Sequence, residues 1–287
     1  MNRPHSRLPV VAAVVVLAVV GYFGWQHFKP TQAPALVEAP VVPTPLEPQA
    51  ATEPALPDPS AIQHPIESIA EASPTTADTD PLPALAISDT LVGERLAELL
   101  SRQDLLTFWQ TDGFVRRVVA TVDNLARSHA STKLWPVNPT PERFSTRRGA
   151  DGVETIHPDN RQRYAPLVHM IEAVDTAKAV AVYRSLYPLF QRAYEELGFP
   201  DAYFNDRLVQ VLDHLIATPV PTGPLAITLV EVKGTVPSLR PWVRYEFADP
   251  ALESLSSGRK MLLRTGADNQ RRLQAKLKDI RQRVAKP

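Results

Sequence analysis

The sequence predicts a mainly α-helical globular domain with a small antiparallel β pair, behind an N-terminal transmembrane helix and a disordered, Pro-rich linker. Three observations predict this order. Leu8 to Trp25 is an 18-residue stretch without a charged side chain, just inside the length at which a helix crosses a bilayer. Residues 30–83 contain 13 prolines. In residues 84–287 most apolar side chains recur three or four residues apart, which is the spacing of amphipathic helices.

The charges that flank the apolar stretch predict its orientation. Arg3 and Arg7 precede it and only Lys29 follows closely, a bias that keeps the N-terminus in the cytoplasm. A cleaved signal peptide is the alternative, but its apolar core should be shorter and end in small residues. This stretch ends in bulky aromatic residues, the last of them Trp25. We therefore expect residues 1–29 to form a cytoplasmic tail and an uncleaved anchor.

The linker is predicted from its composition. Residues 30–83 carry eight acidic residues and no Lys or Arg. Such a segment cannot bury enough apolar surface to offset the entropy lost on ordering. At ~3.1 Å per residue in polyproline II its reach is at most roughly 170 Å. We expect a passive spacer, and the alternative is a Pro-rich segment that docks into a groove.

Apolar spacing and capping residues predict the first helices of the domain. A short helix is expected over Ser88–Leu100. A second is expected from Ser101, which with Asp104 resembles a capping box, to about Ser128, with Gly113 loosening its middle.

The middle of the domain contains a candidate hairpin and two helices. Residues 144–146 and 153–156 are candidate strands around an Asp-Gly turn, with a surface loop as the alternative. Pro166 suits the first turn of the next helix. A long helix then follows, with a kink at Pro188 and Gly198 as its C′ cap.

The last part of the domain combines a β pair with further helices. Asn205 is a good N-cap for one helix. Residues 225–229 and 243–247 alternate as half-buried strands do. Asp249 and Pro250 suit a helix start that Gly258 then breaks, and Asp268 is expected to cap the last helix.

Three segments of the domain carry a resemblance to a known family. In order they read YRSLYPLFQRAYEELGFP, YFNDRLVQVLDHLIATP and YEFADPALESLSSGRKMLLRTGADN. They resemble the bacterial domain of unknown function 3014 family, and the resemblance covers about Ser88 to Arg283. It implies a mostly helical domain behind a single N-terminal membrane segment in Gram-negative bacteria, and it implies no activity. We therefore expect a single-pass protein of the bacterial inner membrane with its domain in the periplasm.

The sequence contains few signs of catalytic or metal chemistry. Cysteine is absent, which excludes disulfides and thiolate sites, and the G-x-S-x-G, Walker A, G-x-G-x-x-G and H-E-x-x-H patterns are absent too. His169 and Glu172 share a helix face, but a di-iron bundle needs Glu-x-x-His twice and two further Glu. We expect neither a metal nor another cofactor. His157 and His214 each have an Asp nearby, and we interpret each His and Asp as a surface or capping pair.

Two groups of residues are candidates for binding. At the turn before one helix, two aromatic and three polar residues are poorly explained by packing, and Asp206 and Arg207 are the first candidates for an exposed binding surface. The candidates there are Tyr203, Asn205, Asp206 and Arg207. The aromatic stripe before them reads as core, with a ligand groove as the alternative, and comprises Tyr183, Tyr187, Phe190 and Tyr194.

The second group lies in a basic C-terminal segment. The chain holds 31 basic and 31 acidic residues, yet residues 258–287 hold ten basic and two acidic ones. A solvated face is one interpretation, and salt-dependent contact with an anionic envelope component or an acidic partner is the other. A nucleic acid is not expected outside the inner membrane. The candidates are Arg271, Arg272, Lys276 and Lys278.

The anchor, the long linker and the missing catalytic motifs together predict a function. We expect a non-catalytic, membrane-tethered envelope adaptor or scaffold whose helical domain meets another envelope protein or anionic component. The alternative is a periplasmic enzyme whose acid/base site is assembled from residues distant in sequence.

Overall fold

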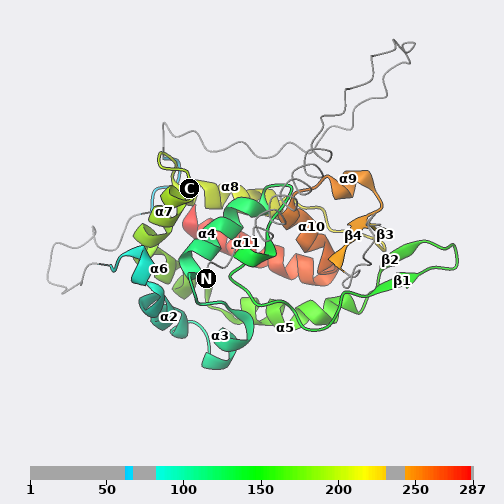
Figure 1. Cartoon of the computed structure of the whole chain (residues 1–287), viewed down its shortest axis with the longest axis horizontal. Helices are drawn as coiled ribbons and strands as arrows, with labels where there is room; N and C mark the ends of the chain where they lie inside the picture. The colour runs from blue at the N-terminus through cyan, green and yellow to red at the C-terminus, as the bar shows by residue number, and fades with distance from the viewer. Residues whose placement is uncertain (1–61, 67–81, 231–242, 286–287) are drawn as a thin grey trace, which may run out of the picture. The chain divides into compact units, whose positions relative to one another are not determined.

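The computed structural model describes residues 62–66, 82–230 and 243–285 (Figure 1). The predicted anchor, Leu8 to Trp25, and most of the predicted linker lie outside these residues. Within the described ranges, no helix has both the length and the apolar character that crossing a membrane requires.

Helices make up most of the described domain, as predicted. Two 3₁₀ helices, η1 (Leu85–Ile87) and η2 (Thr132–Leu134), accompany them. The α-helices are α2 (Asp89–Ala97), α3 (Arg102–Phe108), α4 (Phe114–Leu125), α5 (Asn160–Ala173), α6 (Thr176–Ser185), α7 (Tyr187–Glu196), α8 (Phe204–Ile216), α9 (Pro250–Glu253), α10 (Ser257–Arg264) and α11 (Ala267–Val284).

The second predicted helix is in fact two helices. Ser101 does cap α3, where its hydroxyl accepts the Asp104 amide proton at 3.1 Å. The chain then leaves the helix at Trp109 and restarts after Gly113, which is the N-cap of α4 at φ +60°. This left-handed conformation suits glycine, because a side chain there adds steric strain. The expectation that Gly113 merely loosens one long helix was wrong.

The long helix predicted around Pro188 is also divided. α6 ends at Ser185, and Pro188 lies in the first turn of α7. Proline lacks the N–H that a continuous helix requires, whereas the first turn has no intrahelical use for that donor. Gly198 follows α7 at φ +114°, as expected of a C′ residue. Pro166 lies inside α5 instead of its first turn, so that placement was wrong.

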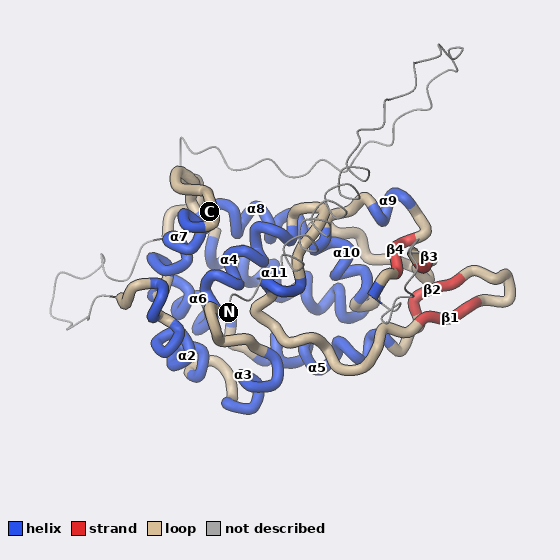
Figure 2. Tube along the Cα trace, in the orientation of Figure 1, coloured by secondary structure: helices blue, strands red, loops and turns tan. Residues whose placement is uncertain are grey.

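Both predicted strand pairs form, and both are antiparallel. β1 (Thr146–Arg148) pairs with β2 (Glu154–Ile156), and β3 (Ile227–Leu229) pairs with β4 (Tyr245–Phe247). A bridge between Thr155 and Ala226 joins the two pairs. They lie together at the end of the domain away from α2 and α3 (Figure 2).

Two predicted helix boundaries near the C-terminus also differ. Gly258 lies inside α10, whose N-cap is Ser256, so it does not break the helix. Its lack of a side chain serves packing instead, since a Cβ there would lie 2.7 Å from the carbonyl oxygen of Leu125 on α4. Gly266 is the N-cap of α11, and Asp268 lies in the first turn without capping it.

The core lies where α4, α7 and α8 meet, and α11 packs along α5, α6 and α8. The aromatic stripe of α6 and α7 contributes to it, with Tyr187, Phe190 and Tyr194 buried. The core interpretation of these three side chains is therefore confirmed.

Candidate functional site

A short piece of the predicted linker lies against the start of α8. The main-chain N–H of Gln63 donates to Asp206 Oδ2 at 2.9 Å, and that of His64 donates to Asp206 Oδ1 at 2.7 Å. Both oxygens of one carboxylate thus accept consecutive amides of the chain.

Two neighbours of Asp206 complete the contact. Asn205 Nδ2 donates to the His64 carbonyl at 2.8 Å, and the Ile66 N–H donates to the Tyr203 hydroxyl at 2.8 Å. The Ile66 side chain packs against the main apolar cluster. We call Tyr203, Asn205 and Asp206 the linker-docking site.

Asn205 does not cap α8, contrary to expectation. The N-cap is Tyr203, and Asn205 is fully buried inside the first turn. Its side chain is used for tertiary contacts instead, because Nδ2 also donates to the Val284 carbonyl at 2.9 Å and Oδ1 accepts the Tyr183 hydroxyl at 3.2 Å. The side-chain amide of Asn205 therefore joins the docked segment to α6 and α11.

Arg207 is not a surface residue, which corrects the sequence interpretation. Only 1% of it is exposed, and its Nε donates to Asp123 Oδ1 on α4 at 2.9 Å. Asp123 also accepts from Arg127 at 2.9 Å. Asp206 is buried as well, beneath the docked segment. Arg207 therefore holds α4 to α8 and does not contact the docked chain.

The basic candidates of α11 mostly pair within the domain. Arg271 pairs with Asp268 at 2.8 Å. Arg272 forms an ion pair with Glu172, and its Nη2 lies 3.0 Å from His169 Nδ1. The helix face that His169 and Glu172 share therefore binds the Arg272 guanidinium. Lys276 donates to the carbonyl oxygens of Val174 and Glu172. Lys278 is exposed, without a side-chain partner in the described ranges.

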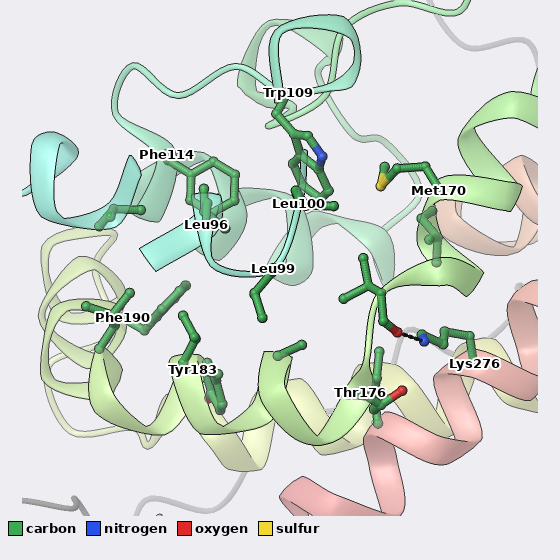
Figure 3. Close-up of a pocket in the computed structure, with 17 residues that line it drawn as sticks. Leu96, Leu99, Leu100, Trp109, Phe114, Met170, Thr176, Tyr183, Phe190 and Lys276 are labelled. Atoms are coloured by element: carbon green, nitrogen blue, oxygen red, sulfur yellow. Dashed lines mark hydrogen bonds between the residues drawn. The ribbon is translucent and has the colours of Figure 1, made fainter. Parts of the chain in front are cut away.

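A cavity of about 230 Å³ lies beside this helix and was not predicted as a distinct site (Figure 3). Tyr183 and Phe190 of the aromatic stripe belong to its wall. The wall is apolar except for Thr176, Lys276 and the polar tips of Trp109 and Tyr183. We call it the apolar pocket. The lining residues are Val92, Leu96, Leu99, Leu100, Trp109, Phe114, Met170, Ile171, Val174, Thr176, Ala179, Val182, Tyr183, Leu186, Phe190, Lys276 and Ile280.

Comparison with known proteins places the domain in a family. The model of the family described as protein of unknown function (DUF3014) matches residues 114–281, which is more than half of the chain. The chain belongs to the DUF3014 family. No match to a curated protein or to a solved structure was found. The DUF3014 match includes the linker-docking site, whereas the docked residues 63–66 precede it.

The DUF3014 region also contains a half-buried histidine contact. His214 Nε2 lies 2.8 Å from Ser256 Oγ, while the neighbouring Asp213 pairs with Arg281 at 2.8 Å. Burial, followed by the charges of Arg259 and Arg207, lowers the pKa of His214 to about 4. His157 lies 3.5 Å from Asp159, as the sequence suggested. In the described ranges, no three His, Asp or Glu side chains gather as metal ligands would.

Proposed function

We propose that the protein is a non-catalytic envelope adaptor, tethered to the bacterial inner membrane through Leu8 to Trp25, whose periplasmic domain binds a short, bent peptide segment of another envelope protein. The observation that carries this proposal is the linker-docking site. It holds residues 63–66 through main-chain groups: Asp206 takes two N–H groups, Asn205 takes a carbonyl and Tyr203 takes a third N–H.

Main-chain recognition explains how the site accepts a partner. Every peptide offers the same main-chain N–H and C=O groups, so these contacts supply affinity, and a side-chain pocket supplies selectivity. The only apolar anchor of the docked segment is Ile66. Residues 63 and 64 form a bend, which lets two consecutive N–H groups reach one carboxylate. The site therefore fits a bent segment with an aliphatic residue two positions after the amide pair that Asp206 binds.

The proposal also gives the linker a role. Buried Asp206 needs donors, because a hydrogen bond to a charged group contributes about 1.5–3 kcal/mol and an unsatisfied buried charge costs more. The linker supplies these donors from the same chain, so it acts as an intramolecular ligand of the site. A partner peptide must displace residues 63–66, so binding is regulated by this internal competitor.

Crosslinking in intact cells tests the proposal. A photoreactive side chain at Ala202, next to the docking site, is introduced into the full chain. We expect it to trap an envelope protein. Asp206→Asn should remove this product, and Asp201→Asn, which changes an exposed carboxylate nearby, should keep it. Equal products from both variants would contradict the proposal.

A third variant tests the competitor. Ile66→Asp places a charge against the apolar cluster and should expel the linker segment. The yield of the crosslinked product should then rise, because the site is free for the partner. A lower yield would show that residues 63–66 help to form the binding surface and do not compete for it.

A further inference from the structure

The apolar pocket forms where six helices meet. α2, α4, α5, α6, α7 and α11 each supply lining residues, and Figure 3 shows their side chains pointing into one shared space. A cavity of about 150 Å³ lined by aliphatic and aromatic residues stays dry and takes up benzene. By that comparison, about 230 Å³ holds roughly nine carbon atoms.

Lys276 brings a charge to this otherwise apolar wall. Its ammonium donates to the carbonyl oxygens of Val174 and Glu172, at the end of α5. An ammonium has three protons, so one donor remains after these two contacts. Among the described residues, no carboxylate lies within ion-pair distance of Lys276.

The other charges of α11 make Lys276 distinctive. The arginines of this helix are all paired with carboxylates in the described structure: Arg271, Arg272, Arg281 and Arg283. Lys278 is also unpaired, but it does not line the pocket. Lys276 has no direct ion pair among the described residues, although the Glu172 and Asp279 carboxylates act on its charge from farther away. Such a cation next to apolar space is complementary to a molecule with an alkyl body and a single anionic end.

Thr176, the other polar residue at this end of the pocket, is already engaged. Its hydroxyl hydrogen-bonds the Asp279 carboxylate, and this contact contributes to lowering the pKa of Asp279. Thr176 therefore does not compete for an anionic ligand. The remaining N–H donor of the Lys276 ammonium therefore determines where the anionic end of a bound molecule would lie.

We infer that the apolar pocket binds a free medium-chain fatty acid of roughly eight to ten carbons. The alkyl chain occupies the space between Leu96, Phe114 and Phe190, and the carboxylate meets the Lys276 ammonium. Burial of the chain supplies most of the affinity at about 0.8 kcal/mol per methylene group. The ion pair selects an acid over a neutral ester.

Methionine methyl NMR tests this inference on the full chain. The protein is labelled with [¹³C-methyl]methionine in lipid nanodiscs and titrated with sodium decanoate. Met170 lines the pocket and Met261 does not, so one chain carries both reporter and control. We expect a saturable shift of the Met170 resonance only. Methyl decanoate should bind about tenfold more weakly, because it lacks the charge that pairs with Lys276.

Two pairs of variants separate the pocket from general lipid effects. Ala179→Phe fills the pocket and should abolish the Met170 shift, whereas Ala177→Phe, exposed on the same helix, should preserve it. Lys276→Met should remove the preference for the acid over the ester, and Lys278→Met should keep it.

Three results would overturn the inference. One is an unchanged Met170 shift in Ala179→Phe, which would place the ligand elsewhere. Another is an equal response to acid and ester in the unmodified protein, which would point to a lipid acyl chain. The third is a retained acid preference in Lys276→Met, which would remove Lys276 as the partner of the carboxylate.

Discussion

The Tyr183 hydroxyl donates to Asn205 Oδ1 at 3.2 Å, and this contact joins the apolar pocket to the linker-docking site. Tyr183 forms part of the pocket wall, while Asn205 holds the carbonyl oxygen of His64. Burial raises the pKa of Tyr183 well above its ordinary value, so the hydroxyl keeps its proton and remains a donor. We therefore expect a shift of Tyr183 in the pocket to change the position of the Asn205 side-chain amide that binds the His64 carbonyl.

The first prediction concerns this contact. Tyr183→Phe preserves the ring in the pocket but removes the donor to Asn205, at a cost of about 0.5–1.5 kcal/mol. We expect amide hydrogen exchange at residues 63–66 to accelerate by up to about tenfold. Tyr164→Phe, on α5 and outside the docking site, should leave exchange there unchanged. Equal exchange in both variants would show that Tyr183 does not support docking.

The second prediction concerns the buried pair of Asp123 and Arg207. Asp123→Asn leaves the Arg207 guanidinium without its counter-charge between α4 and α8, which should reduce the free energy of unfolding by about 3–5 kcal/mol. Urea denaturation measures this loss. Glu196→Gln removes the exposed partner of Arg116 and should cost at most about 1 kcal/mol. Similar losses would mean that the buried pair is not a principal stabilising contact.

The third prediction concerns pH. The pKa of His214 falls from 6.5 to about 4 on folding, so below pH 6.5 the unfolded chain binds a proton that the folded chain resists. This contribution to stability is complete above pH 6.5 and is lost as the pH falls toward 4. His214→Gln should therefore lose less free energy of unfolding between pH 7 and pH 5 than the unmodified protein. Exposed His129→Gln should match the unmodified protein, and parallel curves for all three would contradict the prediction.

The fourth prediction compares two helical glycines. A Cβ at Gly258 would lie 2.7 Å from both Leu125 O and Leu215 Cδ2, so Gly258→Ala should destabilise the domain by about 1–3 kcal/mol. Gly93 lies inside α2 with no atom within 4 Å of an added Cβ. Gly93→Ala should stabilise by about 0.5–1 kcal/mol through helix propensity. Thermal unfolding of the two variants should move in opposite directions, and a shift of the same sign would contradict the packing argument.

Several local features were predictable because they depend on nearby residues. Ser101 as a cap, Gly198 after α7 and Asp249 before Pro250 follow from contacts within four residues, and all three are confirmed. The breaks at Gly113 and Leu186 were missed. The apolar spacing continues through both breaks, since the helices on either side contribute to the same core.

The candidate site was only partly predictable. Tyr203, Asn205 and Asp206 were recognised as polar and aromatic residues that local packing does not explain, but Arg207 beside them is buried in an ion pair. No local pattern distinguishes these roles, because they depend on which distant segment faces each side chain. His64 and Asp206 are 142 residues apart in sequence.

By itself, the sequence determined the helical character of the domain, its strand pairs and its family, because these depend on side-chain spacing and short-range capping. Only the tertiary structure decided which polar residues are buried, that a piece of the linker lies on α8, and that Lys276 borders an apolar pocket. Those features depend on contacts between segments far apart in the chain, and no short-range pattern specifies such contacts.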